Sequence, residues 1–151
     1  MITGASGKLG RRAAELTLEK CPPERLILVT RNPEGLTDLG ERGADVRFGD
    51  FSDPPSLRKA FAGGERMLLV STTNLGLRIN QHRAAIDAAV AAGVGHVIYT
   101  SVLLPAPPNP SVIAPSHHFT ERALAESGMS WTVLRNSLYA DYQVPEAVRA
   151  I

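Results

Sequence analysis

Short runs of apolar and β-branched residues alternate along this chain with longer stretches in which apolar residues recur at helical spacing. This alternation is typical of β-α-β units, in which helices connect parallel strands. Several of the apolar runs are continuous, as expected of strands that helices cover on both faces. The six predicted strands span residues 1–3, 26–30, 45–48, 67–71, 96–101 and 131–134. The five predicted helices span residues 9–20, 33–42, 55–61, 78–92 and 116–126.

The chain has 151 residues, which is enough for one domain with a buried core. Residues 103–115 contain five prolines and predict a long loop after the fifth strand, at the edge where open α/β sheets bind ligands. Only two residues precede Thr3 in the first strand, and a helical pattern beginning at Pro145 ends without a cap. We therefore expect a single domain over residues 1–151 that is truncated at both ends.

The charge balance limits the classes of partner. Charged residues make up 21% of the chain and the net charge is +1, so we expect neither a nucleic acid nor a membrane as partner. No leader-like start or long apolar run is present, and Cys21 is the only cysteine, which predicts a cytoplasmic protein without disulfides. The four histidines form no metal-binding pattern with Cys21, so we expect no metal.

The most informative motif lies between the first strand and the first helix. Gly4, Gly7 and Gly10 follow one another at a spacing of three. In such a turn the first glycine permits a tight bend, the second lets the backbone approach a diphosphate, and the third lets helix and strand pack closely. The alternative is a glycine-rich turn that only connects packed elements. The predicted cofactor-binding residues of this turn are Gly4, Ala5, Ser6, Gly7, Lys8, Leu9 and Gly10.

The end of the second predicted strand indicates which dinucleotide would bind. Thr30-Arg31-Asn32 stands where folds that prefer NAD carry an acidic residue. A carboxylate there would repel a 2′-phosphate, whereas the Arg31 guanidinium can pair with it and stack on the adenine. We therefore predict NADP(H) as cofactor. In the alternative interpretation, Arg31 only faces solvent before a turn.

Three further strand ends carry candidate cofactor contacts: Asp50 and Phe51 after the third strand, Ser71, Thr72 and Thr73 after the fourth, and Thr100 and Ser101 at the end of the fifth. Asp50 could accept a hydrogen bond from the adenine amino group and Phe51 could cover the ring, or Asp50 could brace the helix that follows. The hydroxyls would line the path of the cofactor riboses, or bind only the local backbone.

The acid–base pair of standard short-chain dehydrogenases is absent. Those enzymes use Tyr-x-x-x-Lys, and none of the three lysines stands at that spacing from a tyrosine. We therefore assign no catalytic residue. His117 and His118, at the start of a predicted helix, could reach a substrate, but we expect a surface or capping role for them.

Together these motifs resemble the NmrA-like atypical short-chain dehydrogenases, and most closely their NADPH-dependent quinone oxidoreductases and triphenylmethane dye reductases. The resemblance runs in order over essentially the whole chain. Its motifs are Gly4-Ala-Ser-Gly-Lys-Leu-Gly10, Thr30-Arg31-Asn32-Pro33, Gly49-Asp50, Gln81-His82-Arg83, Ala91-Ala92-Gly93-Val94, Tyr99-Thr100-Ser101, His117 with Thr120-Glu121, and Leu134-Arg135-Asn136 followed by Tyr139.

The resemblance implies a doubly wound Rossmann fold that binds NADPH through the glycine turn, Arg31 and the segment 71–73. It further implies that a loop matching residues 136–141, with Asn136 and Tyr139, lies along the nicotinamide. Members of this subgroup transfer hydride to quinones or dyes without the Tyr–Lys pair, so a quinone-like small molecule is the implied substrate. They are about twice this length, so the C-terminal substrate part is missing here. Other members sense NADP(H) without turnover and act through a protein partner, and a remnant with neither activity is a third hypothesis.

Overall fold

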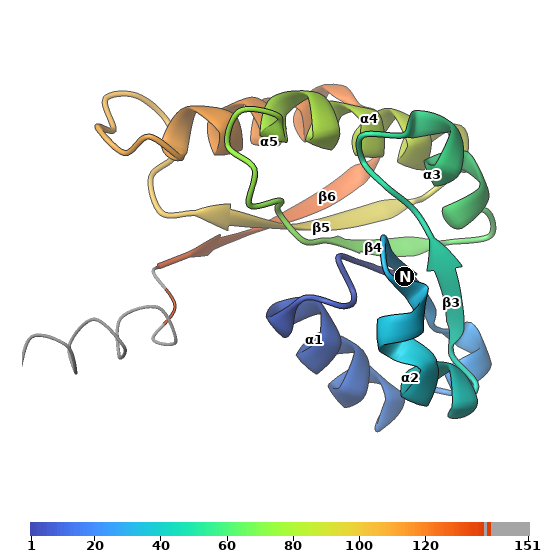
Figure 1. The fold of residues 1–151 in the computed structure, drawn as a ribbon. Coiled ribbons are helices and arrows are strands. Elements are labelled where there is room, and N and C mark those ends of the chain that lie inside the picture. Colours follow the sequence, from blue (N-terminus) through green and yellow to red (C-terminus); the bar gives the residue numbers. More distant parts are fainter. Residues whose placement is uncertain (138, 140–151) are drawn as a thin grey trace, which may run out of the picture.

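The computed structural model describes residues 1–137 and 139. In this part of the chain six parallel strands form one sheet in the order β3-β2-β1-β4-β5-β6, with helices on both faces (Figure 1). The strands are β1 (Ile2–Thr3), β2 (Ile27–Thr30), β3 (Asp45–Phe48), β4 (Arg66–Leu69), β5 (His96–Val102) and β6 (Ser130–Asn136). The helices are α1 (Lys8–Leu18), α2 (Thr37–Glu41), α3 (Pro54–Ala60), α4 (Arg78–Ala91) and α5 (Ala114–Glu126). This is the predicted doubly wound fold.

The helices form two layers. Figure 1 shows α1 and α2 on one face of the sheet and α3, α4 and α5 on the other. Alternate side chains of β2 enter the two cores: Ile27 and Val29 pack beneath the layer of three helices, and Leu28 packs beneath the layer of two. Burial on both faces explains why this strand reads as a continuous apolar run.

Small side chains bring the helices close to the sheet. Ala85, Ala88 and Ala89 of α4 are buried in the larger core. Gly10 and Ala14 are the buried residues of α1. The alanine-rich pattern of residues 84–92 is therefore a packing feature, because only side chains of this size leave the backbones of helix and sheet so near each other.

The strand order places a topological switch point at one edge of the sheet, and we call this place the crevice. β1 and β4 are neighbours at its centre, and the chain leaves β1 toward α1 on one face and β4 toward α4 on the other. The connections diverge at the carboxyl ends of these two strands, which is where open α/β sheets bind ligands. The glycine turn and the segment after β4 therefore lie at the same place.

Some predicted boundaries were wrong. The expected helix over residues 33–42 is a 3₁₀ helix (Pro33–Leu36) followed by the short α2, because two glycines weaken it and the Thr37 hydroxyl donates to the Glu34 carbonyl. β6 extends to Asn136, beyond the apolar run that ends at Leu134. Pro115 lies in the first turn of α5, where proline is tolerated, so the loop is shorter than predicted. The helical pattern predicted from Pro145 lies outside the described residues.

Candidate functional site

The turn between β1 and α1 is a tight bend that requires glycine at two positions. Gly4 has a φ of +60°, and its carbonyl accepts a hydrogen bond from the Gly7 N–H at 2.9 Å. A Cβ added to Gly10 would lie 2.3 Å from the Gly4 carbonyl oxygen and 2.9 Å from the Ala5 Cα. Real Cβ atoms do not approach so closely, so Gly10 lets α1 begin directly against the turn. The Ala5 N–H donates to the Val29 carbonyl and ties the turn to β2.

The N-terminus of α1 is left without a side-chain cap. Gly7 is the N-cap residue and has no side chain to accept from the first-turn N–H groups, and that turn contains no acidic residue. The neighbouring Ser6 hydroxyl lies 2.7 Å from the Thr30 hydroxyl instead of capping the helix. The first amides of the helix, with their partial positive charge, are therefore available to an anion in the crevice. Gly7 and Lys8 are exposed there, so the turn fits a diphosphate.

Arg31 stands at the end of β2, beside this turn. Its neighbour Thr30 is buried and bonded to Ser6, and the Asn32 N–H donates to the Thr30 hydroxyl at 3.0 Å. Arg31 itself is exposed, and within the described residues its guanidinium makes no ion pair or hydrogen bond. Arg11 of α1, by contrast, is engaged with Asp38 and with the Gly35 carbonyl. Arg31 is thus the guanidinium that can meet a ligand at this strand end.

The residues after β3 show that Asp50 braces the helix that follows. The Asp50 carboxylate accepts a hydrogen bond from the Ser52 N–H at 2.8 Å, and the Asp50 N–H donates to the Ser56 hydroxyl at 3.0 Å. These bonds brace the start of α3. The Phe51 ring stands edge-on to the His82 ring, with 6.5 Å between centroids. Contact of Asp50 and Phe51 with an adenine stays a prediction.

Segment 71–73 leaves the end of β4 next to the glycine turn. A Cβ on Gly4 would lie 3.5 Å from the Val70 Cβ, which places the two connections side by side. The Ser71 N–H donates to the Thr100 hydroxyl at 2.9 Å, so Thr100 is brought to this segment. Thr73 is exposed, and the Thr72 hydroxyl oxygen is buried with no hydrogen-bond partner in the described part of the chain.

Ser101 is not brought to this segment. Because alternate side chains of a strand face opposite sides, Ser101 lies under α5 and donates to Glu121 at 2.7 Å. Arg135 of β6 binds the same carboxylate through two nitrogens, at 3.1 and 2.7 Å. Burial alone would raise the pKa of Glu121, but hydrogen bonds from Arg135 and Ser101 outweigh it, so the pKa lies below its ordinary value.

Asn136 and Tyr139 lie together at the carboxyl end of β6. The Asn136 amide donates to the Tyr139 hydroxyl at 2.9 Å, and the Asn136 carbonyl accepts from the Leu103 N–H at 3.1 Å. The second bond ties the proline-rich loop to the last strand. Residues 138, 140 and 141 of the loop implied by the resemblance lie outside the described residues.

Sequence reasoning missed a buried polar network behind segment 71–73. Its members come from α4, β5 and α5 and are all at most 7% exposed: Arg78, His82, Tyr99, Ser116, His117 and Thr120. The Tyr99 hydroxyl lies 2.6 Å from His117 Nδ1, and Arg78 lies 3.2 Å from His117 Nε2. The surface or capping role expected for His117 is therefore wrong, because the residue is 3% exposed and its ring contacts Tyr99 and Arg78, while α5 has no side-chain cap. His118 is half-buried.

Burial sets the protonation of this network. It is the main cause that lowers the pKa of His82 to about 3 and that of His117 to about 4, and the charge of Arg78 adds to both shifts. Burial also raises the pKa of Tyr99 far above its ordinary value. Both histidines are therefore neutral and Tyr99 is a poor acid at neutral pH. The spacings Arg78–His82 and His117–Thr120–Glu121, each on one helix face, were the available sequence signal.

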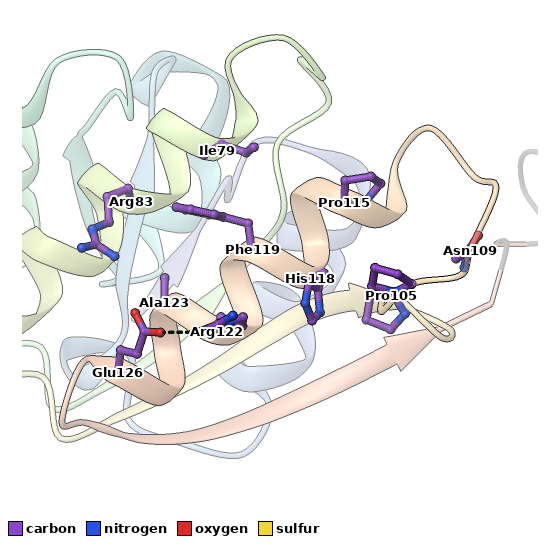
Figure 2. A pocket seen from close by; sticks show the side chains of 11 residues that line it. Ile79, Arg83, Pro105, Asn109, Pro115, His118, Phe119, Arg122, Ala123 and Glu126 are labelled. Carbon is purple, nitrogen blue, oxygen red and sulfur yellow. Dashed lines mark hydrogen bonds and ion pairs between the residues drawn. The ribbon is translucent and has the colours of Figure 1, made fainter.

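A groove of about 480 Å³ lies elsewhere, between the proline-rich loop and the outer sides of α4 and α5. Figure 2 shows Phe119 reaching across toward Ile79 of α4, with His118 and Pro115 nearer the loop. None of the predicted cofactor residues lines this groove. No helix among residues 1–137 is long and apolar enough to cross a membrane. In the same part of the chain, no three metal-ligating side chains gather into a group.

Comparison with known proteins agrees with this geometry. A family described as NAD(P)H-binding matches residues 4–150. Quinone oxidoreductase 2 of Escherichia coli is 39% identical over 150 residues, which cover 99% of this chain and 52% of that protein. An NmrA-like family domain-containing oxidoreductase of Aspergillus flavus is 31% identical over 147 residues, or 93% of this chain and 48% of that protein. The chain spans about half the length of the curated relatives it matches.

Solved structures give the same result. The NADPH complex of an NADPH-dependent quinone oxidoreductase from Escherichia coli superposes with a TM-score of 0.92 at 38% identity, over 99% of this chain and 52% of that chain. The NADP(H) complex of Citrobacter sp. triphenylmethane reductase gives 0.91 at 36% identity, over 99% of this chain and 53% of that one.

Proposed function

This chain belongs to the NAD(P)H-binding family, with NmrA-like oxidoreductases among its relatives, and from that premise we propose that it binds NADPH in the crevice between β1 and β4 and serves NADPH-dependent hydride transfer to a quinone-like acceptor. The observation that carries the proposal is the uncapped α1, which starts directly against a turn that admits only glycine at residue 10. Relatives named as quinone oxidoreductase and triphenylmethane reductase support the acceptor class.

The residues of the crevice divide the binding work. The first-turn amides of α1 would hold the diphosphate. Arg31 would pair with the 2′-phosphate and so select NADPH over NADH. Asp50 and Phe51 would meet the adenine, and segment 71–73 would lie along the nicotinamide half, with Asn136 and Tyr139 beyond it.

Bound NADPH supplies a hydride. A quinone accepts hydride readily, so a site that holds donor and acceptor in contact needs no strong general acid, and the proton that completes the hydroquinone can come from solvent. Tyr99 does not supply it, because burial raises its pKa and its hydroxyl faces the buried His117 ring.

Thermal unfolding with each cofactor tests the binding step. A ligand at 100 times its dissociation constant stabilises the folded state by about 2.7 kcal/mol, so NADPH should raise Tm by several degrees at concentrations where NADH does not. No shift with either nucleotide would contradict the proposal.

Turnover then separates the two functional classes. Steady oxidation of NADPH in the presence of 1,4-benzoquinone indicates a reductase, which we propose acts in the cytoplasm. Binding without oxidation favours a redox sensor of the NmrA type.

A further inference from the structure

The residues that follow β4 form hydrogen bonds with buried side chains instead of with a neighbouring strand. The last ladder pair of β4 is Leu69 with Tyr99. Each of the next three backbone N–H groups donates to a buried side chain from a different element: Val70 to Thr3 of β1 at 3.1 Å, Ser71 to Thr100 of β5 at 2.9 Å, and Thr72 to His82 of α4 at 3.1 Å. This part of the crevice wall is therefore ordered by side chains far from it in sequence.

The peptide groups on both sides of Thr72 are bound from α4. His82 Nε2 accepts from the Thr72 N–H, and Arg78 Nε donates to the Thr72 carbonyl at 2.7 Å. The two side chains are four residues apart and so lie on the same face of α4. Within the described residues no carboxylate pairs with Arg78, whose other partners are the neutral Ser116 hydroxyl and His117 Nε2. The shortest hydrogen bond of the Arg78 guanidinium is therefore the one to the Thr72 carbonyl.

These contacts determine which ring nitrogen of His82 carries the hydrogen. Because His82 Nε2 accepts from an amide, the ring hydrogen of the neutral imidazole is on Nδ1, which lies 2.9 Å from the Thr120 hydroxyl. The Thr120 hydroxyl in turn donates to the Ser116 carbonyl at 2.8 Å. Thr120 therefore fixes both the tautomer and the ring orientation that the Thr72 amide requires.

We propose that His82, oriented by Thr120, is a positioning residue that holds the Thr72 peptide and thereby sets segment 71–73 against the nicotinamide half of NADPH. The inference rests on the proposed cofactor binding. The segment lies beside Gly4, where the diphosphate would leave the glycine turn, and so borders the path of the second ribose. The adenine half, at Arg31 and Asp50, lies on the other side of that turn and approaches the network only through Phe51, whose ring stands edge-on to His82 with 6.5 Å between centroids.

This division gives the test a ligand control. Adenosine 2′,5′-bisphosphate carries the adenine and the 2′-phosphate but no nicotinamide half. His82→Leu leaves the Thr72 N–H without an acceptor, whereas His82→Gln can still present an oxygen to it. Val97→Ala removes apolar volume from the same core at a fully buried site that makes no bond to the segment. The dissociation constants of both ligands are measured by titration calorimetry for the 151-residue chain and each variant.

The expected result is selective. His82→Leu should weaken NADPH about tenfold, since one buried donor loses its partner. It should weaken the bisphosphate less, because at the adenine end it changes only the packing of Phe51 against residue 82. His82→Gln should recover most of the NADPH affinity, and Val97→Ala should change neither constant. Equal effects of His82→Leu on both ligands, or none on NADPH, would overturn the inference. Failure of the unsubstituted chain to bind either ligand would instead refute the proposed function, and the inference with it.

A second variant keeps the test decisive if His82→Leu does not fold. Thr120→Val removes the nearer partner of His82 Nδ1, leaves it only the Tyr99 hydroxyl at 3.4 Å, and does not alter the Thr72 amide. We expect faster hydrogen exchange at the Thr72 N–H in the ligand-free variant, together with weaker NADPH binding and unchanged bisphosphate binding. Exchange at Thr72 as slow as in the unsubstituted chain, with unchanged NADPH affinity, would overturn the inference.

Discussion

Replacement of Gly10 by alanine is the sharpest test of the crevice. The new Cβ would lie 2.3 Å from the Gly4 carbonyl oxygen and 2.8 Å from the Gly4 carbonyl carbon, so α1 must move away from the turn. Such overpacking costs about 1–3 kcal/mol, and the better helix propensity of alanine returns roughly 0.5–1 kcal/mol. The net loss of stability should be about 1 kcal/mol.

The effect on cofactor binding should exceed the effect on stability. A shift of the first helical turn misaligns several amides that would bind the diphosphate, and each hydrogen bond to a charged group contributes about 1.5–3 kcal/mol. We therefore expect the dissociation constant of NADPH to rise at least about tenfold. Urea denaturation measures the free energy of unfolding, and titration calorimetry measures the affinity.

The chain offers a matched control for this substitution. Gly40 also lies in a helix, but its added Cβ would be 3.6 Å from a Val46 methyl carbon, which is ordinary contact. Gly40→Ala should therefore leave NADPH binding unchanged and should not reduce stability. If Gly10→Ala behaves in the same way, the close approach of α1 to the turn does not matter for the cofactor, and the reasoning about the crevice is wrong.

Three further predictions use the charged and titratable groups. Arg31→Asp should invert the preference between NADPH and NADH, with NADPH weakened about ten- to a hundredfold in calorimetric titrations, because a phosphate meets a carboxylate in place of a guanidinium. The free energy of unfolding should fall as pH drops below roughly 6.5, by up to about 1.4 kcal/mol per pH unit for each of His82 and His117, because these histidines bind protons in the unfolded chain but stay neutral when buried. Urea titrations between pH 7 and 4.5 measure this dependence, which should be weaker for His82→Gln. Glu121→Gln should destabilise the chain at neutral pH and remove part of the stability loss below about pH 4. Arg135 lowers the pKa of Glu121 in the folded state, and the stabilisation that this gives is lost when Glu121 is protonated. The same urea titrations, continued to lower pH, measure the free energy of unfolding.

Features that depend on residues close together in the sequence, such as the glycine turn and the buried strands, could be predicted. The glycine turn was recognisable because three glycines at fixed spacing between a strand and a helix have few other uses, and the continuous apolar run of β2 predicted a strand buried on both faces. The alternation of strands and helices then predicted a doubly wound parallel sheet. Boundaries were weaker where the pattern was mixed, as in β6, whose last residues Arg135 and Asn136 are polar yet continue the ladder with β5.

Helical spacing placed members of the buried network on common helix faces, but their partners could not be predicted, because the contacts join different elements of the fold. A histidine in an alanine-rich helix reads as an ordinary polar position, and nothing local shows that the ring of His82 meets the backbone of Thr72. Likewise, Thr100 and Ser101 read as equivalent hydroxyls at one strand end. Only the register of β5 shows that the first supports segment 71–73 and the second supports α5.

The two sides of the crevice, the glycine turn and the segment after β4, are therefore stabilised in different ways. This difference predicts how each tolerates substitution. At the glycine turn the backbone itself occupies the space, so any added side chain at Gly10 displaces it directly. At the end of β4 the backbone leaves the strand ladder and is held by Thr3, Thr100 and His82, none of which need touch a ligand. Substitutions of these three buried residues should therefore alter cofactor affinity indirectly, by shifting the backbone that they hold. Substitutions at exposed Thr73 should act only through direct contact with the cofactor.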